Sequence, residues 1–186
     1  MPGPTRIEGF AIISEDGMLA DSERRIPPAL VVEADQRFFH GSLEHAAVVV
    51  HGRRSHEGGP HADTRFRLVV TRSVASLAPH PTLPKTLLWN PQGATLEEAW
   101  ARLGAPNGML AVIGNGDVNQ IFLDRGFDAF HLSRVDGVRL PGGRPVFPGI
   151  GPNRTPEDIL AEHGLKPAAP HVLDEAAGAT LVNWRR

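Results

Sequence analysis

The stretch from Met109 to Leu123, MLAVIGNGDVNQIFL, constrains the fold of this chain more than any other part. Residues 110–114 are mostly apolar, which indicates a buried strand. Three residues that tolerate positive φ follow and predict a sharp turn: Gly114, Asn115 and Gly116. Asp117 suits the start of a helix whose apolar face begins with Val118. Such a turn presents backbone N–H groups to an anion, so we interpret the stretch as the floor of a dinucleotide pocket, although the same pattern also serves packing alone.

The composition narrows the class of protein. The chain has 186 residues, of which 41% are apolar and 22% charged, and this predicts one globular α/β domain over residues 1–186. Its net charge of −2 favours neither nucleic acid nor an anionic membrane surface. The absence of cysteine excludes disulfides, thiolate metal sites and a cysteine nucleophile. Since no long apolar run and no signal-peptide core is present, we expect a cytoplasmic protein.

Apolar runs and turn residues predict the remaining elements. Strands are expected over 7–14, 46–50, 67–73, 85–89 and 128–135, and a terminal hairpin over 171–173 and 180–185. Helices are expected over 33–43, 96–103 and from 156 to 163. We interpret residues 18–28 as a mobile loop and 78–84 as a proline-rich connection. Strands alternate with helices, which predicts a mostly parallel sheet with an antiparallel edge.

Two further strand ends carry groups that suit phosphate. The strand over 46–50 runs into His51-Gly52-Arg53-Arg54-Ser55, which we interpret as a second glycine turn and helix start. The strand over 67–73 ends in Thr71, Arg72 and Ser73. One guanidinium group can bind two phosphate oxygens at once, so these two strand ends predict a pyrophosphate or ribose-phosphate site. The alternative is that these arginines are simply solvated.

The expected helix over 33–43 carries a carboxylate on an apolar face. Asp35, Phe38 and Phe39 stand at positions i, i+3 and i+4 and therefore share one side of the helix. Burial of a carboxylate there is costly unless it is hydrogen-bonded. Two interpretations remain open: a functional acid, or a solvated aspartate at the edge of an amphipathic helix.

Together these pieces resemble the dihydrofolate reductase family and the related reductase domain of bacterial riboflavin biosynthesis. The stretches that carry the resemblance, in order, are AIISEDG, EADQRFF, VVVHGRRSHE, RLVVTR, LEEAWARLG, AVIGNGDVNQIFL, FHLSRVD, VFPG and LVNWRR. The resemblance implies a dihydrofolate reductase-like three-layer α/β sandwich with a mostly parallel central sheet and an antiparallel C-terminal edge strand. It also implies NADPH-dependent hydride transfer to a pteridine- or pyrimidine-like small molecule, and suggests a homodimer.

The resemblance assigns expected roles to particular residues. Asp35 would be the catalytic carboxylate and Ser133 the hydroxyl that braces it. Three residues would bind substrate: Phe39, Arg65 and Ile12. The cofactor would be held by Ala11, Leu19, Gly52, Arg53, Arg54, Ser55, Thr71, Arg72, Ser73, Gly114, Asn115, Gly116, Asp117 and Val118. The arginines favour NADPH over NADH, because the additional phosphate brings negative charge that needs partners.

Some features depart from the family pattern. Asn115 replaces the second glycine of a pair where the family holds a cis peptide, Asn119 stands near an expected tyrosine, and residues 18–28 lack a tryptophan. A non-catalytic or differently specific nucleotide-binding member is therefore the main alternative. Less favoured are an ordinary Rossmann dehydrogenase with Asp136 as its ribose acid, and a metal protein using histidines that recur every five residues: His51, His56 and His61.

Overall fold

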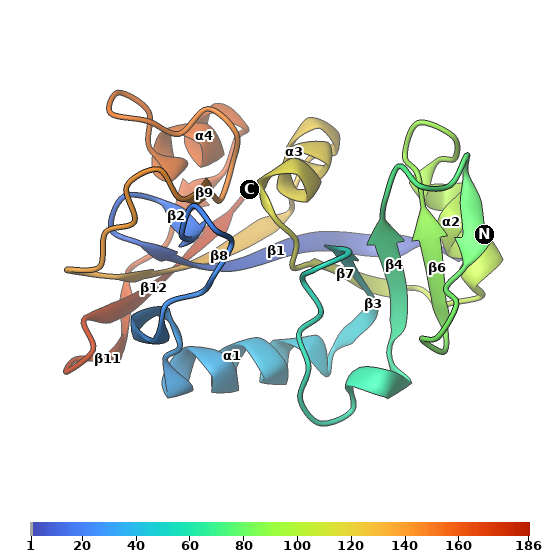
Figure 1. The fold of residues 1–186 in the computed structure, drawn as a ribbon, viewed down its shortest axis with the longest axis horizontal. Helices are drawn as coiled ribbons and strands as arrows, with labels where there is room; N and C mark the ends of the chain where they lie inside the picture. The colour runs from blue at the N-terminus through green and yellow to red at the C-terminus, as the bar shows by residue number, and fades with distance from the viewer. Residues whose placement is uncertain (1) are drawn as a thin grey trace.

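The computed structural model describes residues 2–186 and is built around a ten-stranded sheet (Figure 1). Across the sheet the strands are β10 (Lys166–Pro167), β12 (Ala179–Arg185), β8 (Ala129–Val135), β1 (Pro4–Ser14), β7 (Gly108–Val112), β3 (Ala46–Gly52), β4 (Phe66–Val70), β6 (Thr86–Trp89) and β5 (Leu77–Pro79), with β11 (His171–Asp174) paired to β12. The six strands from β8 to β6 run parallel, while β12 and β5 are antiparallel to their neighbours. The predicted parallel sheet with an antiparallel C-terminal edge is therefore confirmed.

Helices cover both faces of the sheet and make three layers. Helix α1 (Glu33–Leu43) lies on one face, and α3 (Gly116–Arg125) and α4 (Pro156–Glu162) lie on the other (Figure 1). Helix α2 (Leu96–Leu103) packs on the same face of the sheet as α3 and α4. Its start is fixed by a capping box, in which Thr95 accepts a hydrogen bond from the backbone of Glu98 and the Glu98 side chain accepts one from the backbone of Thr95.

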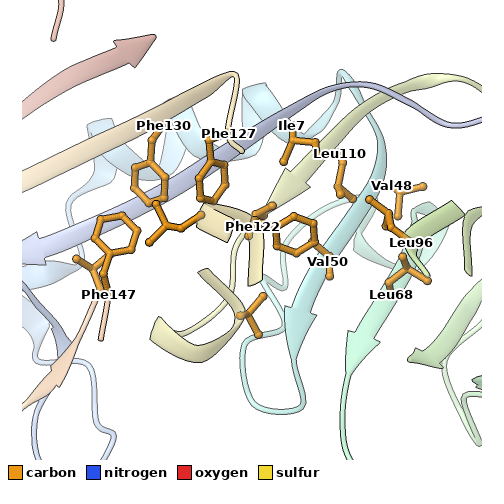
Figure 2. Packing of buried hydrophobic residues seen from close by; sticks show 14 of the residues in the cluster. Ile7, Val48, Val50, Leu68, Leu96, Leu110, Phe122, Phe127, Phe130 and Phe147 are labelled. Carbon is orange, nitrogen blue, oxygen red and sulfur yellow. The ribbon is translucent and has the colours of Figure 1, made fainter. Parts of the chain in front are cut away.

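The larger core lies between the sheet and the three helices α2, α3 and α4. Four phenylalanines from separate elements meet there (Figure 2): Phe122, Phe127, Phe130 and Phe147. Gly9 on β1 permits this packing, because a Cβ at that position would lie 2.3 Å from the Phe130 ring and 2.9 Å from that of Phe127. The smaller core beneath α1 contains Phe10, Val49 and Met109, with Phe38 and Phe39 packed against it.

Two connections contain strands that the sequence did not indicate. Residues 18–28 were expected to be a mobile loop, but Met18–Ala20 form β2, which pairs with β9 (Arg144–Pro145) in a second, two-stranded sheet. Long-range hydrogen bonds hold this segment: Val146 N donates to Gly17 O at 3.1 Å, and Leu140 N donates to Asp16. Likewise, the proline-rich connection over 78–84 begins with β5, because its extended backbone pairs with β6.

Two short 3-10 turns, η1 (Pro28–Leu30) and η2 (Ala62–Thr64), complete the fold. Among residues 2–186, no helix combines the length and the apolar character needed to cross a membrane.

Candidate functional site

Asp35 lies buried on the sheet-facing side of α1 and is hydrogen-bonded to β8. It is 6% exposed, and the Ser133 hydroxyl donates to its Oδ1 at 2.7 Å. No hydrogen bond from the described residues reaches Oδ2, and that oxygen is not sealed from solvent. Asp35 is therefore not a solvated residue at the helix edge, and one of its two oxygens remains free for a ligand.

Burial raises the pKa of Asp35 above its ordinary value, while the hydrogen bond from Ser133 and the charge of His40 oppose this effect. A raised pKa makes the protonated form of this carboxyl more accessible than in an exposed aspartate. Ile12 pairs with Ser133 across the β1–β8 ladder, so Ile12 lies on the same part of the sheet as the acid.

Aromatic rings line α1 beside Asp35. The ring centroid of Phe10 lies 6.2 Å from those of both Phe38 and Phe39. Phe39 is half-buried, so its ring offers a partly open apolar surface one helical turn from Asp35. The sequence-based expectation of an aromatic next to the acid agrees with this geometry.

A buried polar cluster under α1 was not anticipated from the sequence. His131 on β8 lies 2.8 Å from Glu8 Oε2 through Nε2 and 2.6 Å from Asn183 Oδ1 through Nδ1, and it stacks on Phe10. The hydrogen bond from His131 holds the pKa of Glu8 below its usual range, although burial opposes it. The three residues of this polar cluster, Glu8, His131 and Asn183, come from β1, β8 and β12. No local sequence pattern could therefore have revealed the cluster.

The three strand ends with phosphate-binding character meet at one edge of the sheet. Gly52 ends β3 and pairs with Val70, which ends β4. A Cβ on Gly52 would lie 3.0 Å from the Asn115 side chain, so the end of β3 also touches the turn after β7. Arg53, Arg72 and the Gly114–Gly116 turn therefore share the carboxyl edge, as the sequence predicted.

The turn after β7 opens α3, but the expectation of positive φ there is wrong: Asn115 has a φ of −77°, and neither Gly114 nor Gly116 is among the described residues with positive φ. Close packing requires the glycines instead, because a Cβ at Gly114 would lie 2.5 Å from the Val118 side chain. Asn115 is the N-cap, and its Oδ1 accepts a hydrogen bond from Val118 N at 3.1 Å. All peptide bonds in the described part of the chain are trans, including that between Gly114 and Asn115. Asp117 places a negative charge in the same first turn, which works against an anion there.

The predicted helix start after β3 is wrong. Residues 53–61 form turns and irregular structure, followed only by η2. A buried carboxylate fixes this loop: Glu57 pairs with the guanidinium groups of Arg65 and Arg67. Gly58 and Gly59 have positive φ, which an α-helix does not allow. The loop therefore contains Arg53, Arg54 and Ser55, and no helix N-terminus adds its dipole to these residues.

Arg65, expected to bind substrate, is paired with two carboxylates of this chain. Its two terminal nitrogens pair with Glu57 at 2.9 Å and Glu44 at 2.8 Å. Glu44 follows the last residue of α1, nine residues after Asp35, and at 1.5 Å of rise per residue this places it about 14 Å along the helix from the acid. The structure thus gives Arg65 a role in anchoring the loop after β3.

Two of the residues expected to hold the cofactor, Ala11 and Leu19, lie on the opposite face of the sheet from Ile12. Ala11 and Leu19 both pack against the larger core on the α2–α4 side, whereas Ile12 packs with Leu30 and Val32 on the α1 side. Side chains alternate along a strand, so neighbours Ala11 and Ile12 necessarily point to opposite faces.

The carboxyl edge suits a multiply charged anion. Arg53, Arg54 and Arg72 are exposed, and within residues 2–186 none of them forms a salt bridge. Three unpaired guanidinium groups around one sheet edge fit the phosphates of a dinucleotide. The residues present therefore agree with the cofactor that the sequence predicts.

The architecture, with α1 and its buried acid on one face, is the dihydrofolate reductase-like fold. No family model matches the chain, and no curated protein sequence matches it. Among solved structures, the chain is similar to a protein assigned to riboflavin biosynthesis from Shewanella sp. PV-4, with a TM-score of 0.66 and 18% identity, covering 98% of this chain and 99% of that one.

Two further structures show the same fold. Dihydrofolate reductase from Enterococcus faecalis, solved with NADP(H) and RAB-propyl, has a TM-score of 0.64 at 17% identity, covering 97% of this chain and 96% of that one. A deaminase/5-amino-6-(5-phosphoribosylamino)uracil reductase from Thermotoga maritima has a TM-score of 0.66 at 15% identity, covering 99% of this chain and 56% of the longer protein. The fold expected from the sequence resemblance is therefore confirmed.

Proposed function

We propose that this protein is an NADPH-dependent reductase that transfers hydride to a pteridine- or pyrimidine-like ring. The observation that carries the proposal is the buried Asp35, hydrogen-bonded by Ser133 and flanked by Phe39, on a fold shared with reductases. A flat heterocycle with adjacent N–H groups suits a carboxylate beside an aromatic ring, since the oxygen accepts hydrogen bonds and the ring packs on its face.

Asp35 would orient the ring and bias its protonation. Its raised pKa favours a carboxyl that shares a proton with a ring nitrogen, which makes the adjacent carbon a better hydride acceptor. Ser133 would hold Oδ1, leaving Oδ2 toward the substrate. NADPH supplies the hydride when it is bound.

Arg53, Arg54 and Arg72 would bind the cofactor phosphates, because they are exposed cations at the carboxyl edge of the sheet. The backbone of Gly116 at the start of α3 would add N–H donors. The residues after β4, Thr71 and Ser73, would contribute hydroxyl groups to the same phosphates.

The test is NADPH consumption by the full chain with a panel of dihydropterins, dihydrofolate and ribosylaminopyrimidines. Asp35→Asn keeps the side-chain shape and should lower turnover at least ~100-fold with NADPH affinity unchanged, the usual scale for a positioned acid. Asp124→Asn, on the exposed side of α3, is the matched control and should behave as wild type.

Turnover that survives in Asp35→Asn would remove this acid from the reaction. A protein that binds NADPH and reduces none of the panel would instead favour the alternative, a nucleotide-binding relative without folate or riboflavin chemistry. Asp117 supports that alternative, because its carboxylate stands at the helix start where a phosphate is expected.

A further inference from the structure

His131 lies on the same strand and the same face of the sheet as Ser133, the residue that holds Asp35. Side chains two positions apart on a strand point to one side, about 6.6 Å from each other, so His131 and Ser133 both face α1. Ser133 donates to Asp35 at 2.7 Å, and the His131 ring meets the Phe38 ring edge-on, with 5.7 Å between centroids. Asp35 and Phe38 are three positions apart on α1 and share one of its sides. Strand β8 therefore contacts this side of α1 at two points, one polar and one aromatic.

Partners on both sides fix the orientation of the His131 ring. Nε2 donates to Glu8 Oε2 at 2.8 Å, because an ionised carboxylate can only accept, and Nδ1 lies 2.6 Å from Asn183 Oδ1. Glu8 is held in turn by Arg6, whose Nε lies 2.8 Å from Oε1, and the charge of Arg185 also acts on it. Glu8 and Asn183 stand on the two strands that flank β8, so the ring cannot rotate without losing a partner on each side.

The fixed ring supports the aromatic residues under α1. His131 stacks on Phe10, with 4.8 Å between ring centroids and 26° between the planes. Phe10 in turn lies 6.2 Å from both Phe38 and Phe39. Phe38 and Phe39 follow Asp35 by one helical turn, so the position of their rings on the sheet also sets the position of the acid.

This contact acts on Asp35 through packing and not through charge. The charge that opposes the raised pKa of Asp35 comes from His40, on α1 itself. His131 is 6% exposed and both of its nitrogens have partners, so it has no free group to offer a ligand.

We propose that His131 is a positioning residue for Asp35: its ring, fixed by Glu8 and Asn183, supports Phe38 and holds α1 at the distance from the sheet at which Asp35 is buried and meets Ser133. The proposal concerns the placement of the acid, and it does not depend on the proposed function.

The test is the titration of the Asp35 carboxyl group in the full chain, followed by NMR of its carboxyl carbon, in wild type and in His131→Gln. Glutamine retains a donor for Glu8 but removes the ring. Burial is the main cause of the raised pKa of Asp35, so an α1 that moves away from the sheet should let this pKa fall by at least about 0.5 toward its ordinary value. A pKa that is unchanged or higher in His131→Gln would overturn the proposal.

Gly9→Ala is the matched control for a loss of stability alone. It disturbs the core on the opposite face of the sheet, where its Cβ would overlap the Phe130 ring, and it should leave the Asp35 titration as in wild type. If Gly9→Ala lowers the pKa of Asp35 as far as His131→Gln does, the effect is general destabilisation and His131 has no positioning role.

A rescue variant tests whether the ring is the cause. His131→Phe combined with Glu8→Gln restores an aromatic ring between Phe10 and Phe38, and it removes the carboxylate that a phenyl ring cannot pair with. The pKa of Asp35 should return to the wild-type value, and a double variant that titrates like His131→Gln would refute the proposal. If His131→Gln does not fold, Phe38→Leu decides, because it removes the ring on the α1 side of the same contact and should lower the pKa in the same way.

The result separates this proposal from the proposed function. If the Asp35 titration follows His131 as expected while no heterocycle is reduced, the proposed function fails and the positioning role stands. If reduction requires Asp35 but the Asp35 titration does not respond to His131→Gln, the positioning role fails and the proposed function stands.

Discussion

Glu57→Gln should be one of the most destabilising single substitutions in this protein. The carboxylate has no exposed side-chain surface, and its partners Arg67 and Arg65 are only 1% and 7% exposed. Arg67 Nη2 donates to Glu57 Oε2 at 2.7 Å and also to Ala62 O at 2.6 Å, so the guanidinium cannot turn to solvent. Glutamine keeps an acceptor but leaves the buried Arg67 without a counter-charge, while Arg65 keeps only its pairing with the exposed Glu44.

Breaking a buried ion pair from one side costs about 3–5 kcal/mol, and the retained amide favours the lower end, about 3 kcal/mol. In a chain of this size that corresponds to a fall in Tm of roughly 6–12 °C. The assay is thermal and urea unfolding of both proteins at pH 7. Glu44→Gln is the matched control, because Glu44 also pairs with Arg65 but is exposed, and its midpoint should stay near wild type.

The pH dependence gives an independent check on the same interaction. Burial would raise the pKa of Glu57, but the hydrogen bonds and charge of Arg67 outweigh it and hold the pKa below its usual value. The stability from this group is therefore present above about pH 4.3, the unfolded value, and is lost as the pH falls through the folded pKa. The difference in free energy of unfolding between wild type and Glu57→Gln should therefore become smaller as the pH falls. Equal midpoints at pH 7 would refute the reasoning.

Three further predictions concern the core and the candidate site. Gly9→Ala should cost at least about 2 kcal/mol in urea unfolding, because its Cβ would overlap the Phe130 ring, and a neutral effect would contradict the packing described. Arg72→Gln should reduce the ratio of NADPH to NADH affinity, and an unaltered ratio in binding titrations would exclude a phosphate role. Ser133→Ala should raise the apparent pKa of turnover, because Ser133 stabilises the ionised form of Asp35, and an unmoved pH profile would show that this bond is not used.

The sequence predicts the parts of this protein that depend on local pattern. The strand, glycine turn and helix predicted from Met109 to Leu123 form β7, the turn and α3. Such elements can be predicted because the spacing of apolar residues and the position of turn residues are set within a few neighbouring positions. The convergence of Arg53 and Arg72 at one edge follows from parallel strand direction. The contact between Asp35 and Ser133, 98 residues apart, came only from the family resemblance.

Other features depend on long-range pairing that no local pattern encodes. The loop after β3 resembles a helix start, but its shape is decided by Glu57, which finds Arg65 and Arg67 eight and ten residues later. In the sequence these three charged residues resemble ordinary solvated groups, and only the fold shows that they are buried together. Strand β2 forms only because β9, more than a hundred residues away, supplies its partner.

The most direct measurement is the transfer of deuterium from NADPH labelled at its nicotinamide C4 to a ring carbon of a candidate heterocycle, followed by mass spectrometry of the product. The account predicts label on the product with wild-type protein and at least ~100-fold less with Asp35→Asn at saturating NADPH. Equal labelling by both proteins, or NADPH binding without transfer to any pteridine or pyrimidine, would contradict it.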